Sequence, residues 1–565
     1  MTGDANGESR RDFLKLATVA GGAAIAATKI RPLYAQASNA SGGTYDYVVA
    51  GGGHNGLICA AYLARAGFDV AVLEAKPVAG GNTATEHCTG TSMLHEPCCN
   101  TPGGLFGSPV YRELDLEGWG VEYAPLSRLD GMVRLSQFYD GETLPMWLDP
   151  EKTAAEIARF SKRDAQTYLA LMDEDGPPLG SFRRTPIGYG PSIEEICAGH
   201  PRGATFLKRR RARCVDTVKE FYEDEHVRAW VLDYARGRQP SDDIGTGDGV
   251  GDMYGRQARG NNTIIGGTGA IPVALTRLLE KYNCPVLTRK FVVELIVEDG
   301  RAAGVITADG DVFRTRRGVV SSAHVQQLLK MCPEGSLPEV FAENIRNWQP
   351  DILSMFNVML DAKEAPLFNV HGDWRPGCGN IINTFDAQLK HLADARQGVV
   401  TRQGVGSKCI VQSLEDPTRC PDGGHTVRIL THFPYQLADG GAIKWDEIKH
   451  DVARDLIESW RPFTKNLDDD NITAMYVQSP LDIEGRNINN VAGSCHGGSN
   501  YDAQYGAMRP VFGWASHRMP IPGLYLTGAG SHPGGSVHGL AGRNAAWVIL
   551  DDEGTTIEKV LRQSA

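Results

Sequence analysis

Near the start of the chain, the spacing of the hydrophobic residues changes twice. This pattern predicts a strand, a helix and a second strand, in that order. Tyr47 to Ala50 is a short apolar run typical of a buried strand, and a second run ends at Glu74. Between the two runs, apolar residues recur at helical spacing until Gly67, where we expect the helix to stop. The positions on this helical face are Leu57, Ile58, Ala60, Ala61, Leu63 and Ala64.

Three glycines lie where the first predicted strand turns into the helix. Gly51 allows a tight turn, Gly53 lets the backbone approach a pyrophosphate, and Gly56 lets helix and strand pack closely. The pyrophosphate would rest on the helix N-terminus, where free N–H groups and the helix dipole favour an anion. Glu74 is placed to bind the adenosine ribose 2′-OH and would repel a 2′-phosphate, so NADP is a poor fit. The glycines alone would also suit an ordinary glycine-rich turn.

The apolar pattern further along the chain predicts the remaining elements. Amphipathic helical periodicity covers residues 151–172 and 215–234, and a connector rich in glycine and proline lies at 176–191. Two runs at 292–297 and 303–307 flank a turn at 298–301, which predicts a β-hairpin. The other predicted elements are helices at 273–282 and 445–460, strands at 318–323, 355–360 and 426–433, and a strand at 522–526 followed by a glycine-rich loop and a helix start.

Length and charge narrow the function classes. With 565 residues the chain predicts two or more domains, and its 42% hydrophobic and 22% charged residues are ordinary for a globular protein. The formal charge of −11 argues against nucleic acid as a general partner. One basic run, Lys208 to Arg213, could contact an anionic membrane surface, but we interpret it as a solvated helix face.

The first 37 residues resemble a twin-arginine signal peptide. Arg10 and Arg11 precede a weakly apolar run of 13 residues, Leu16 to Thr28, which is too short to span a bilayer. Ala35 to Ala37 supplies a small-x-small cleavage site, so we expect export to the periplasm. Removing residues 1–37 changes the formal charge from −11 to −13. The alternative is a disordered tail with a chance arginine pair.

The twelve cysteines show no CxxC spacing, and we predict neither a metal site nor a redox dithiol from them. Cys98 and Cys99 are the one adjacent pair. Some cysteines of an exported protein could form disulfides, although the sequence assigns no pairs. The default interpretation is that they are small buried apolar residues.

Two glycine-rich motifs carry a family resemblance. Gly51 to Gly56 with a second pair, Gly80 and Gly81, resembles the FAD-binding start of the carotenoid (phytoene) desaturase and amine oxidase superfamily. The segment 528–546 resembles its closing FAD motif. Its HPGG (532–535) and GRNAA (542–546) elements are similar to the branch of pyridine nucleotide-disulfide oxidoreductase domain-containing protein 2.

This resemblance implies an α/β fold: a discontinuous, Rossmann-like FAD-binding domain with an inserted α+β substrate domain. The expected FAD-binding segments are 44–130, 255–339 and 485–565, and the expected substrate-domain segments are 131–254 and 340–484. The implied FAD-binding residues are Gly51, Gly53, His54, Asn55, Gly56, Glu74, Ala75, Lys76, Gly80, Gly81, Asn82, Thr83, Val292, Gly528, Ala529, Gly530, Gly535, Ser536 and Val537. Ala529 departs from the family pattern, because many relatives have at this position an acid that holds the ribityl chain.

The chemistry implied is dehydrogenation of a C–C or C–N bond in a small organic, apolar or amine-bearing substrate by hydride transfer from carbon to the flavin, with oxygen or a quinone as electron acceptor. His532 and His538 are the candidate catalytic residues, although each could instead hold the loop. His496 and Arg509 could also face the site. The alternatives are an oxygen-using amine oxidase and a non-catalytic flavin-containing binding or assembly protein. The oligomeric state stays open.

Overall fold

Strands from three separate stretches of the chain form the first sheet of the protein. The computed structural model describes residues 42–99, 102–125, 131–235, 240–260, 262–369, 376–499 and 502–563, so the predicted signal segment lies outside the described residues. The sheet has the order β5-β2-β1-β8-β7-β6, with β14 also paired to β8. Its strands are β1 (Gly43–Ala50), β2 (Val70–Glu74), β5 (Val286–Thr288), β6 (Val292–Glu298), β7 (Arg301–Thr307), β8 (Val312–Ser321) and β14 (Leu524–Leu526).

Alternate residues of β1 point into two different cores. Tyr47 and Val49 pack against helices on one face, whereas Val48 and Ala50 pack on the other. Strands β1, β2, β5, β8 and β14 run parallel, and β6 and β7 form the predicted antiparallel hairpin. A parallel sheet covered on both faces explains why these strands read as nearly continuous apolar runs.

The second sheet belongs to the other lobe of the molecule. Its order is β13-β9-β12-β11-β10-β3-β4, and only the β10–β3 pair is parallel among its described pairings. Trp445, Leu456 and Trp460 of one long helix pack on one face of it. Its strands are β3 (Met132–Phe138), β4 (Thr143–Trp147), β9 (Ser354–Ala362), β10 (Cys378–Ile382), β11 (Ser407–Ile410), β12 (His425–Phe433) and β13 (Ile472–Gln478).

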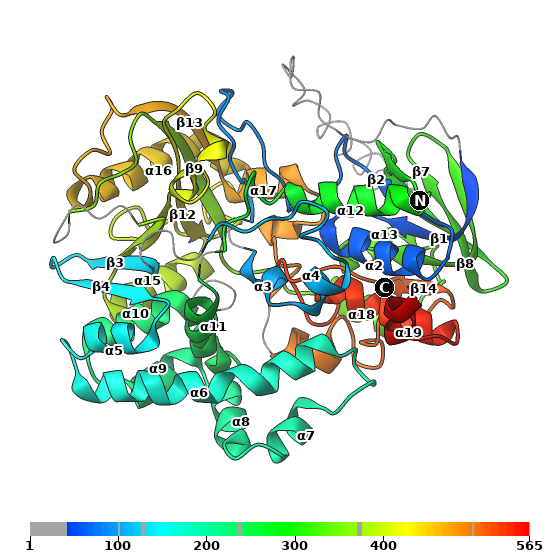
Figure 1. The fold of residues 1–565 in the computed structure, drawn as a ribbon, viewed down its shortest axis with the longest axis horizontal. Helices are drawn as coiled ribbons and strands as arrows, with labels where there is room; N and C mark the ends of the chain where they lie inside the picture. Colours follow the sequence, from blue (N-terminus) through cyan, green and yellow to red (C-terminus); the bar gives the residue numbers. More distant parts are fainter. Residues whose placement is uncertain are drawn as a thin grey trace, which may run out of the picture.

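The helices surround both sheets, and Figure 1 shows the first sheet on the right, the second on the left, and the long α6 along the lower edge. The α-helices are α2 (His54–Arg65), α3 (Gly103–Phe106), α4 (Pro109–Glu113), α5 (Pro150–Ile157), α6 (Lys162–Arg184), α7 (Ile193–Ala198), α8 (Gly203–Arg211), α9 (Cys214–Phe221), α10 (Glu225–Ala235), α11 (Gly251–Arg259), α12 (Ala270–Lys281), α13 (Val325–Met331), α14 (Glu339–Arg346), α15 (Phe385–Arg396), α16 (Trp445–Trp460), α17 (Pro480–Arg486), α18 (Leu540–Asp552) and α19 (Ile557–Gln563). The short 3₁₀ turns are η2 (Gly247–Val250), η3 (Gln412–Leu414), η4 (Pro417–Arg419), η5 (Ala442–Lys444), η6 (Arg461–Phe463), η7 (Val491–Gly493), η8 (Asp502–Gln504) and η9 (Gly506–Met508).

The predicted α/β fold class is confirmed, and the helix at 445–460 coincides with α16. The predicted connector at 176–191 is wrong in its first half, because α6 continues to Arg184. The helix is anchored at both ends: Tyr168 and Leu171 pack in the second lobe, and Phe182 packs in another cluster. Packing at its two ends thus outweighs the local glycine and proline preference. The limits predicted for the five domain segments stay predictions.

Polar caps divide the two long helical stretches that the periodicity suggested. Ser161 begins α6, where its hydroxyl accepts a hydrogen bond from Asp164 N at 3.1 Å. Asp224 begins α10, and its carboxylate accepts from His226 N at 2.9 Å and Val227 N at 3.1 Å. Each stretch therefore becomes two helices, because a capped N-terminus starts a new one.

The basic run at 208–213 is only partly the solvated face that we predicted. Arg209 and Arg210 are 4% and 8% exposed, and Arg210 pairs with Asp248 at 2.9 Å and lies over the Tyr505 ring. Lys208 and Arg211 do face solvent. Arginine stems can be buried along a core while their heads find partners, which a charge count cannot reveal.

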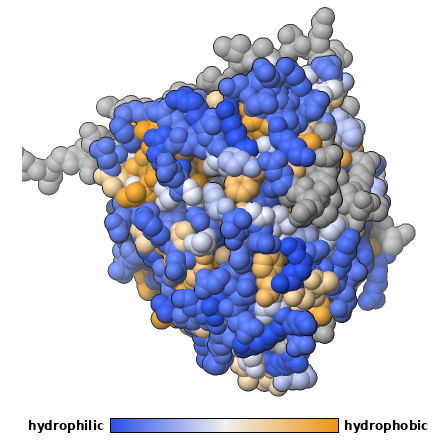
Figure 2. All heavy atoms as spheres, turned by 90° about the vertical axis from the view of Figure 1, so that its left-hand side faces the viewer, coloured by the Kyte–Doolittle hydropathy of each residue, from blue (hydrophilic) through white to orange (hydrophobic). Residues whose placement is uncertain are grey.

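The surface is mainly hydrophilic on the face that Figure 2 shows, where apolar residues are exposed in separate patches. Within the described ranges, none of the helices combines the length and hydropathy that a bilayer crossing requires.

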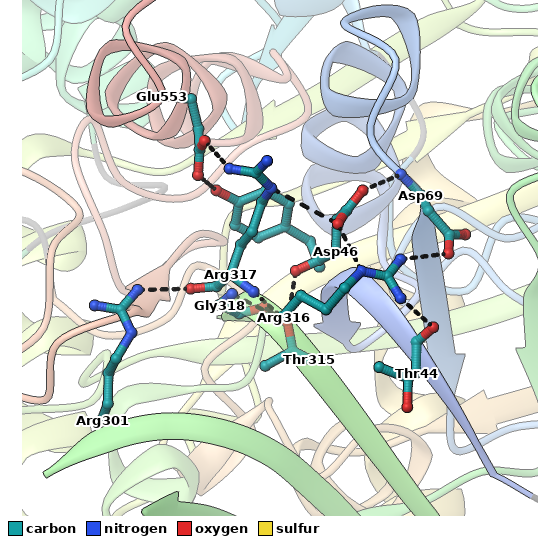
Figure 3. A network of polar contacts seen from close by, with 10 residues as sticks. Thr44, Asp46, Asp69, Arg301, Thr315, Arg316, Arg317, Gly318 and Glu553 are labelled. Carbon is teal, nitrogen blue, oxygen red and sulfur yellow. Dashed lines mark hydrogen bonds and ion pairs between the residues drawn. The ribbon is translucent and has the colours of Figure 1, made fainter. Parts of the chain in front are cut away.

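A network of ion pairs closes the first sheet at the edge where β1 and β2 begin. Arg316 on β8 binds Asp46 through Nε and Asp69 through Nη2, both at 2.9 Å, and Arg317 pairs with Glu553 after α18 (Figure 3). The Tyr47 hydroxyl donates to Glu553 at 2.5 Å. Because this network occupies the amino ends of the strands, the opposite edge, at Gly51 and Glu74, is left for a ligand.

A buried cluster around Arg419 joins three distant segments. The guanidinium contacts Asp416 Oδ2 at 3.1 Å, Glu96 Oε2 at 3.3 Å and the Ile264 carbonyl at 3.1 Å. Glu96 accepts from Thr268 N at 2.6 Å, and Asp416 accepts from Gly266 N at 2.8 Å. The loop before α12 is thereby fixed to η4 of the other lobe.

We expect Arg419→Leu to lower the free energy of unfolding by about 3–5 kcal/mol, because it leaves two buried carboxylates without their cation. Arg402→Leu is the control: Arg402 pairs with Asp455 at a site where its side chain is 45% exposed, so its loss should cost less than about 1 kcal/mol. Denaturant midpoints of both variants measure the difference. Equal midpoints would contradict this role for the cluster.

Candidate functional site

The turn between β1 and α2 has the backbone geometry of an anion site. Gly51 has a φ of 108°, and Gly53 is the N-cap of α2 without a side-chain cap. A Cβ on Gly56 would lie 2.2 Å from the Gly51 carbonyl oxygen, so only glycine allows this close packing of helix and strand. The first N–H groups of α2 therefore face the carboxyl edge of the sheet, where a pyrophosphate can bind.

Glu74 ends β2 beside this turn. Its Oε2 accepts from Gly52 N at 2.9 Å, its Oε1 accepts from Lys76 N at 2.8 Å, and burial raises the pKa of the carboxyl. Each oxygen keeps further acceptor capacity for a ribose hydroxyl. The Glu74 carbonyl accepts from Lys290 N at 2.8 Å, which places Val292 close to the same end of the site. Ala75 is exposed here.

The second glycine pair lies against the first. Gly80 N donates to the Gly52 carbonyl at 2.8 Å, and Gly81 has a φ of 61°. The buried Thr83 closes this turn through its hydroxyl, which donates to the Gly80 carbonyl at 2.6 Å. Asn82 exchanges amide hydrogen bonds with Asn490 at 2.8 and 3.2 Å. The turn is thus tied to the segment that leads to the closing motif.

The closing motif follows β14 at the same edge of the sheet. Gly528 has a φ of 89°, and a Cβ on Gly535 would lie 2.4 Å from the His496 carbonyl oxygen. A Cβ on Gly530 would lie 2.7 Å from Val325 Cγ1. The backbone therefore lies close to its neighbours here, and the carbonyl of Ala529 is held by Arg509.

Two contacts bring the opposite ends of the chain together at this edge. Asn55 Oδ1 accepts from Gly542 N at 3.2 Å, and the His54 ring contacts the Ser536 backbone. A Cβ on Gly542 would lie 2.4 Å from the Asn55 carbonyl oxygen, so α18 packs directly on the start of α2. Val537 packs in the core that α2 shares. The predicted FAD-binding residues of the two motifs therefore meet, while Val292 lies at the Glu74 end.

Ser322 is a site residue that the sequence reasoning missed. It follows β8, and its side chain lies 3.2 Å from where a Cβ of Gly51 would be and 3.6 Å from that of Gly528. Its N–H donates to the Ala50 carbonyl at 2.8 Å. The sequence reasoning placed it inside the strand predicted at 318–323, and the signal available was its position near the carboxyl end of that strand, at the edge where ligands bind.

The two candidate catalytic histidines, His532 and His538, and the nearby His496 differ in their surroundings. His532 is fully buried, its Nε2 lies 3.1 Å from the Phe182 carbonyl, and burial lowers its pKa to about 3. His538 Nδ1 accepts from Leu540 N at 3.0 Å at the start of α18. Both geometries suit the loop-holding alternative; a catalytic role for either stays a prediction. His496 Nδ1 lies 3.7 Å from Asp351 Oδ2.

Arg509 organises the closing loop through main-chain carbonyls. Its guanidinium is fully buried and donates to Ala529, Gly497 and Gln504 carbonyl oxygens at 2.6, 3.0 and 2.8 Å. Burial lowers its pKa to about 10. It therefore positions the backbone behind the closing motif, rather than presenting a free charge to a substrate.

This edge of the sheet fits FAD. It combines an uncapped helix N-terminus, a carboxylate at the end of β2, and glycines whose missing side chains leave the backbone accessible. The start of α18 adds a second helix N-terminus beside the first, which can stabilise electron density on a flavin ring.

Comparisons with known proteins agree with this geometry. Pyridine nucleotide-disulfide oxidoreductase domain-containing protein 2 from Rattus norvegicus is 29% identical, covering 90% of this chain and 94% of that protein. A subunit of limonene dehydrogenase from Castellaniella defragrans is 26% identical, covering 91% and 95%. A putrescine oxidase triple mutant of known structure shares the fold, with a TM-score of 0.61 at 16% identity over 90% of this chain and 99% of that one.

Two family matches cover the segments that build the site. Residues 49–111 match the NAD(P)-binding Rossmann-like domain, and residues 242–550 match Flavin containing amine oxidoreductase. The second match spans more than half of the chain and includes β8, β14 and the closing motif. The chain therefore belongs to the flavin containing amine oxidoreductase family and is an FAD-dependent oxidoreductase.

Proposed function

We propose that this protein is an exported dehydrogenase that converts a C–C single bond of a small apolar molecule into a double bond, by removing a hydride from one carbon and a proton from its neighbour, and that passes the two electrons to oxygen or a quinone. The observation that carries the proposal is the junction of α2 and α18 at Asn55 and Gly542, because it assembles both halves of the FAD site at one sheet edge. The bound FAD would supply the hydride acceptor.

The chain's own residues bind and orient the reactants. The α2 N-terminus and Glu74 would hold the pyrophosphate and ribose, and backbone groups of Gly535 to Val537 would line the flavin. An apolar cluster between the two lobes packs beside Cys495 and would exclude water there. It consists of Cys98, Met355, Cys378, Ile410, Leu430 and Ile483. Dehydrogenation needs no protein nucleophile, so no catalytic triad is expected.

The choice of a C–C over a C–N bond rests on the relatives. Limonene, which the relative from Castellaniella defragrans is named for, is an apolar hydrocarbon. The amine chemistry comes from the description of the matching family and from the name of a solved putrescine oxidase, which at 16% identity is informative for the fold alone. An oxygen-using amine oxidase remains the second candidate.

Export rests on the sequence of the first 37 residues. The arginine pair at positions 10 and 11 and the small-x-small site at 35–37 support the twin-arginine route. That route carries proteins that have already folded. It suits a chain whose cofactor site combines the nucleotide turn with the distant closing motif.

The purified mature protein should show flavin absorption bands that bleach when monoterpene or polyene hydrocarbons are added without oxygen. A panel of primary and polyamines is the comparison, with hydrogen peroxide release measured in air. Bleaching by amines alone, with peroxide release, would replace the proposal by the amine oxidase. A protein that binds no flavin after reconstitution would refute it.

Arg10→Lys combined with Arg11→Lys should leave the full-length, FAD-containing protein in the cytoplasm, because the pair is the feature that the export route recognises. The control exchanges Lys29→Arg and Arg31→Lys outside the pair. Cell fractionation and the mass of the N-terminus measure the result. Normal export of the doubly substituted chain would count against the signal.

His532→Gln separates a structural from a catalytic histidine. Burial keeps His532 neutral when folded, with a pKa lowered from 6.5 to about 3. Unfolded chains bind a proton here between these two values and folded chains do not, so stability should fall as the pH drops from about 6.5 to about 3. The variant should be less stable at pH 7, and its stability should depend less on pH in this window. A fall in kcat of about 100-fold or more with unchanged stability would instead indicate proton transfer.

A further inference from the structure

Cys98 and Cys495 come together between the two lobes although almost four hundred residues separate them. Cys98 belongs to the apolar cluster beside the closing motif, and Cys495 packs against that cluster. The Cys495 thiol donates a hydrogen bond to the Cys98 sulfur. Cys98 is 8% exposed, while Cys495 keeps partial exposure. The sequence does not predict this pair, because the two cysteines are far apart in the chain and have no CxxC spacing. Their contact depends on how the two lobes pack together.

A buried cation lies directly behind the pair. The two terminal nitrogens of Arg428 donate to the Cys98 carbonyl at 3.1 and 3.2 Å, and its Nε donates to Asn357 Oδ1 at 2.9 Å. Arg428 is 4% exposed; Glu96 acts on it from further away, and no carboxylate of the described residues lies within ion-pair distance of it. A buried positive charge without a directly paired carboxylate favours a negative charge nearby, and a thiolate can supply it.

An imidazole lies beside Cys495. The imidazole Nδ1 of His496 lies 3.8 Å from Cys495 Sγ. The hydrogen bond from Cys495 and the charge of Arg428 hold the pKa of Cys98 below its usual value, against the effect of burial. The pKa of Cys495 is raised by the same hydrogen bond. Because the buried guanidinium of Arg428 lies against Cys98, we assign Cys98 as the thiol that reacts as a thiolate and Cys495 as its partner.

We propose that Cys98 is a peroxide-reactive thiol and that Cys495 is its resolving thiol. In the first step the Cys98 thiolate attacks hydrogen peroxide: an S–O bond forms, the O–O bond breaks, and hydroxide leaves, so that sulfur loses two electrons to the peroxide. In the second step Cys495 sulfur attacks Cys98: an S–S bond forms, the S–O bond breaks, and water leaves with the Cys495 proton. Overall, two thiols and one peroxide give a disulfide and two waters.

The position of the pair gives the reaction a consequence for the site. The disulfide would join the segment before α3 to the segment that packs behind Gly535 and Ala529. An oxidase in this family would release peroxide at this same edge, although the thiol reaction needs only peroxide and goes beyond the proposed function.

The test exposes reduced holoprotein to hydrogen peroxide, then denatures it in an alkylating reagent and maps the peptides by mass spectrometry. We expect a Cys98–Cys495 linked peptide that dithiothreitol reverses. Cys88 is the internal control, because it is also partly exposed but burial raises its pKa to about 12. Oxidation of Cys98 and Cys495 no faster than that of Cys88 would overturn the proposal.

Variants assign the two roles. Cys495→Ser should remove the linked peptide and leave a sulfenic acid on Cys98 that dimedone traps, whereas Cys332→Ser, at a buried cysteine in the first lobe, should react as the wild type does. Arg428→Gln should slow the reaction by about tenfold or more, because it removes the cation that favours the thiolate. Unchanged rates in Arg428→Gln, or a dimedone adduct on other cysteines instead, would contradict the mechanism. The flavin spectrum of each sample is read separately, so loss of FAD binding and failure of the thiol reaction remain distinguishable.

Discussion

The contact of α18 with the start of α2 is the constraint on which the rest of the site depends. Asn55 and Gly542 are 487 residues apart, and the backbone N–H of Gly542 donates to the side-chain amide oxygen of Asn55. The packing leaves no room for a side chain at position 542. Because α2 also packs on β1 through Gly56, this contact fixes the relative position of the nucleotide turn and the closing motif. The cofactor edge is therefore defined by close backbone packing more than by any single polar side chain.

Buried charged side chains connect the two lobes around this edge. Arg419, Glu96 and Asp416 connect the loop before α12 with η4, and Arg428 joins β12 to the Cys98 segment. Such groups are costly to bury unless their geometry is well satisfied, and here main-chain N–H and carbonyl groups complete the arrangement. The segment from Glu86 to Cys98 is held on both sides in this way, since His95 also pairs with Asp361 at 2.7 Å.

Much of the fold could be predicted because local sequence and tertiary structure agree there. The glycine turn, the hairpin of β6 and β7, and α16 carry periodicities and turn residues that their final environment also requires. The prediction failed where tertiary contacts dominate: α6 passes through Gly176 and the prolines that follow it, and Arg209 is buried. Cys98 approaches Cys495, and the Arg419 cluster forms, only because the two lobes pack together. No local sequence pattern predicts that packing.

The pairing of β14 has a consequence for how the protein matures. This strand pairs with β8 alone among the described strands, and the closing motif and α18 follow it near the end of the chain. While the ribosome is still synthesising these residues, the nucleotide turn lacks its contact with α18 and the backbone of Gly535. Stable capture of the cofactor must therefore wait until the closing motif and α18 have been synthesised and have packed on α2, and a chain shortened before Leu540 would lack half of the cofactor site.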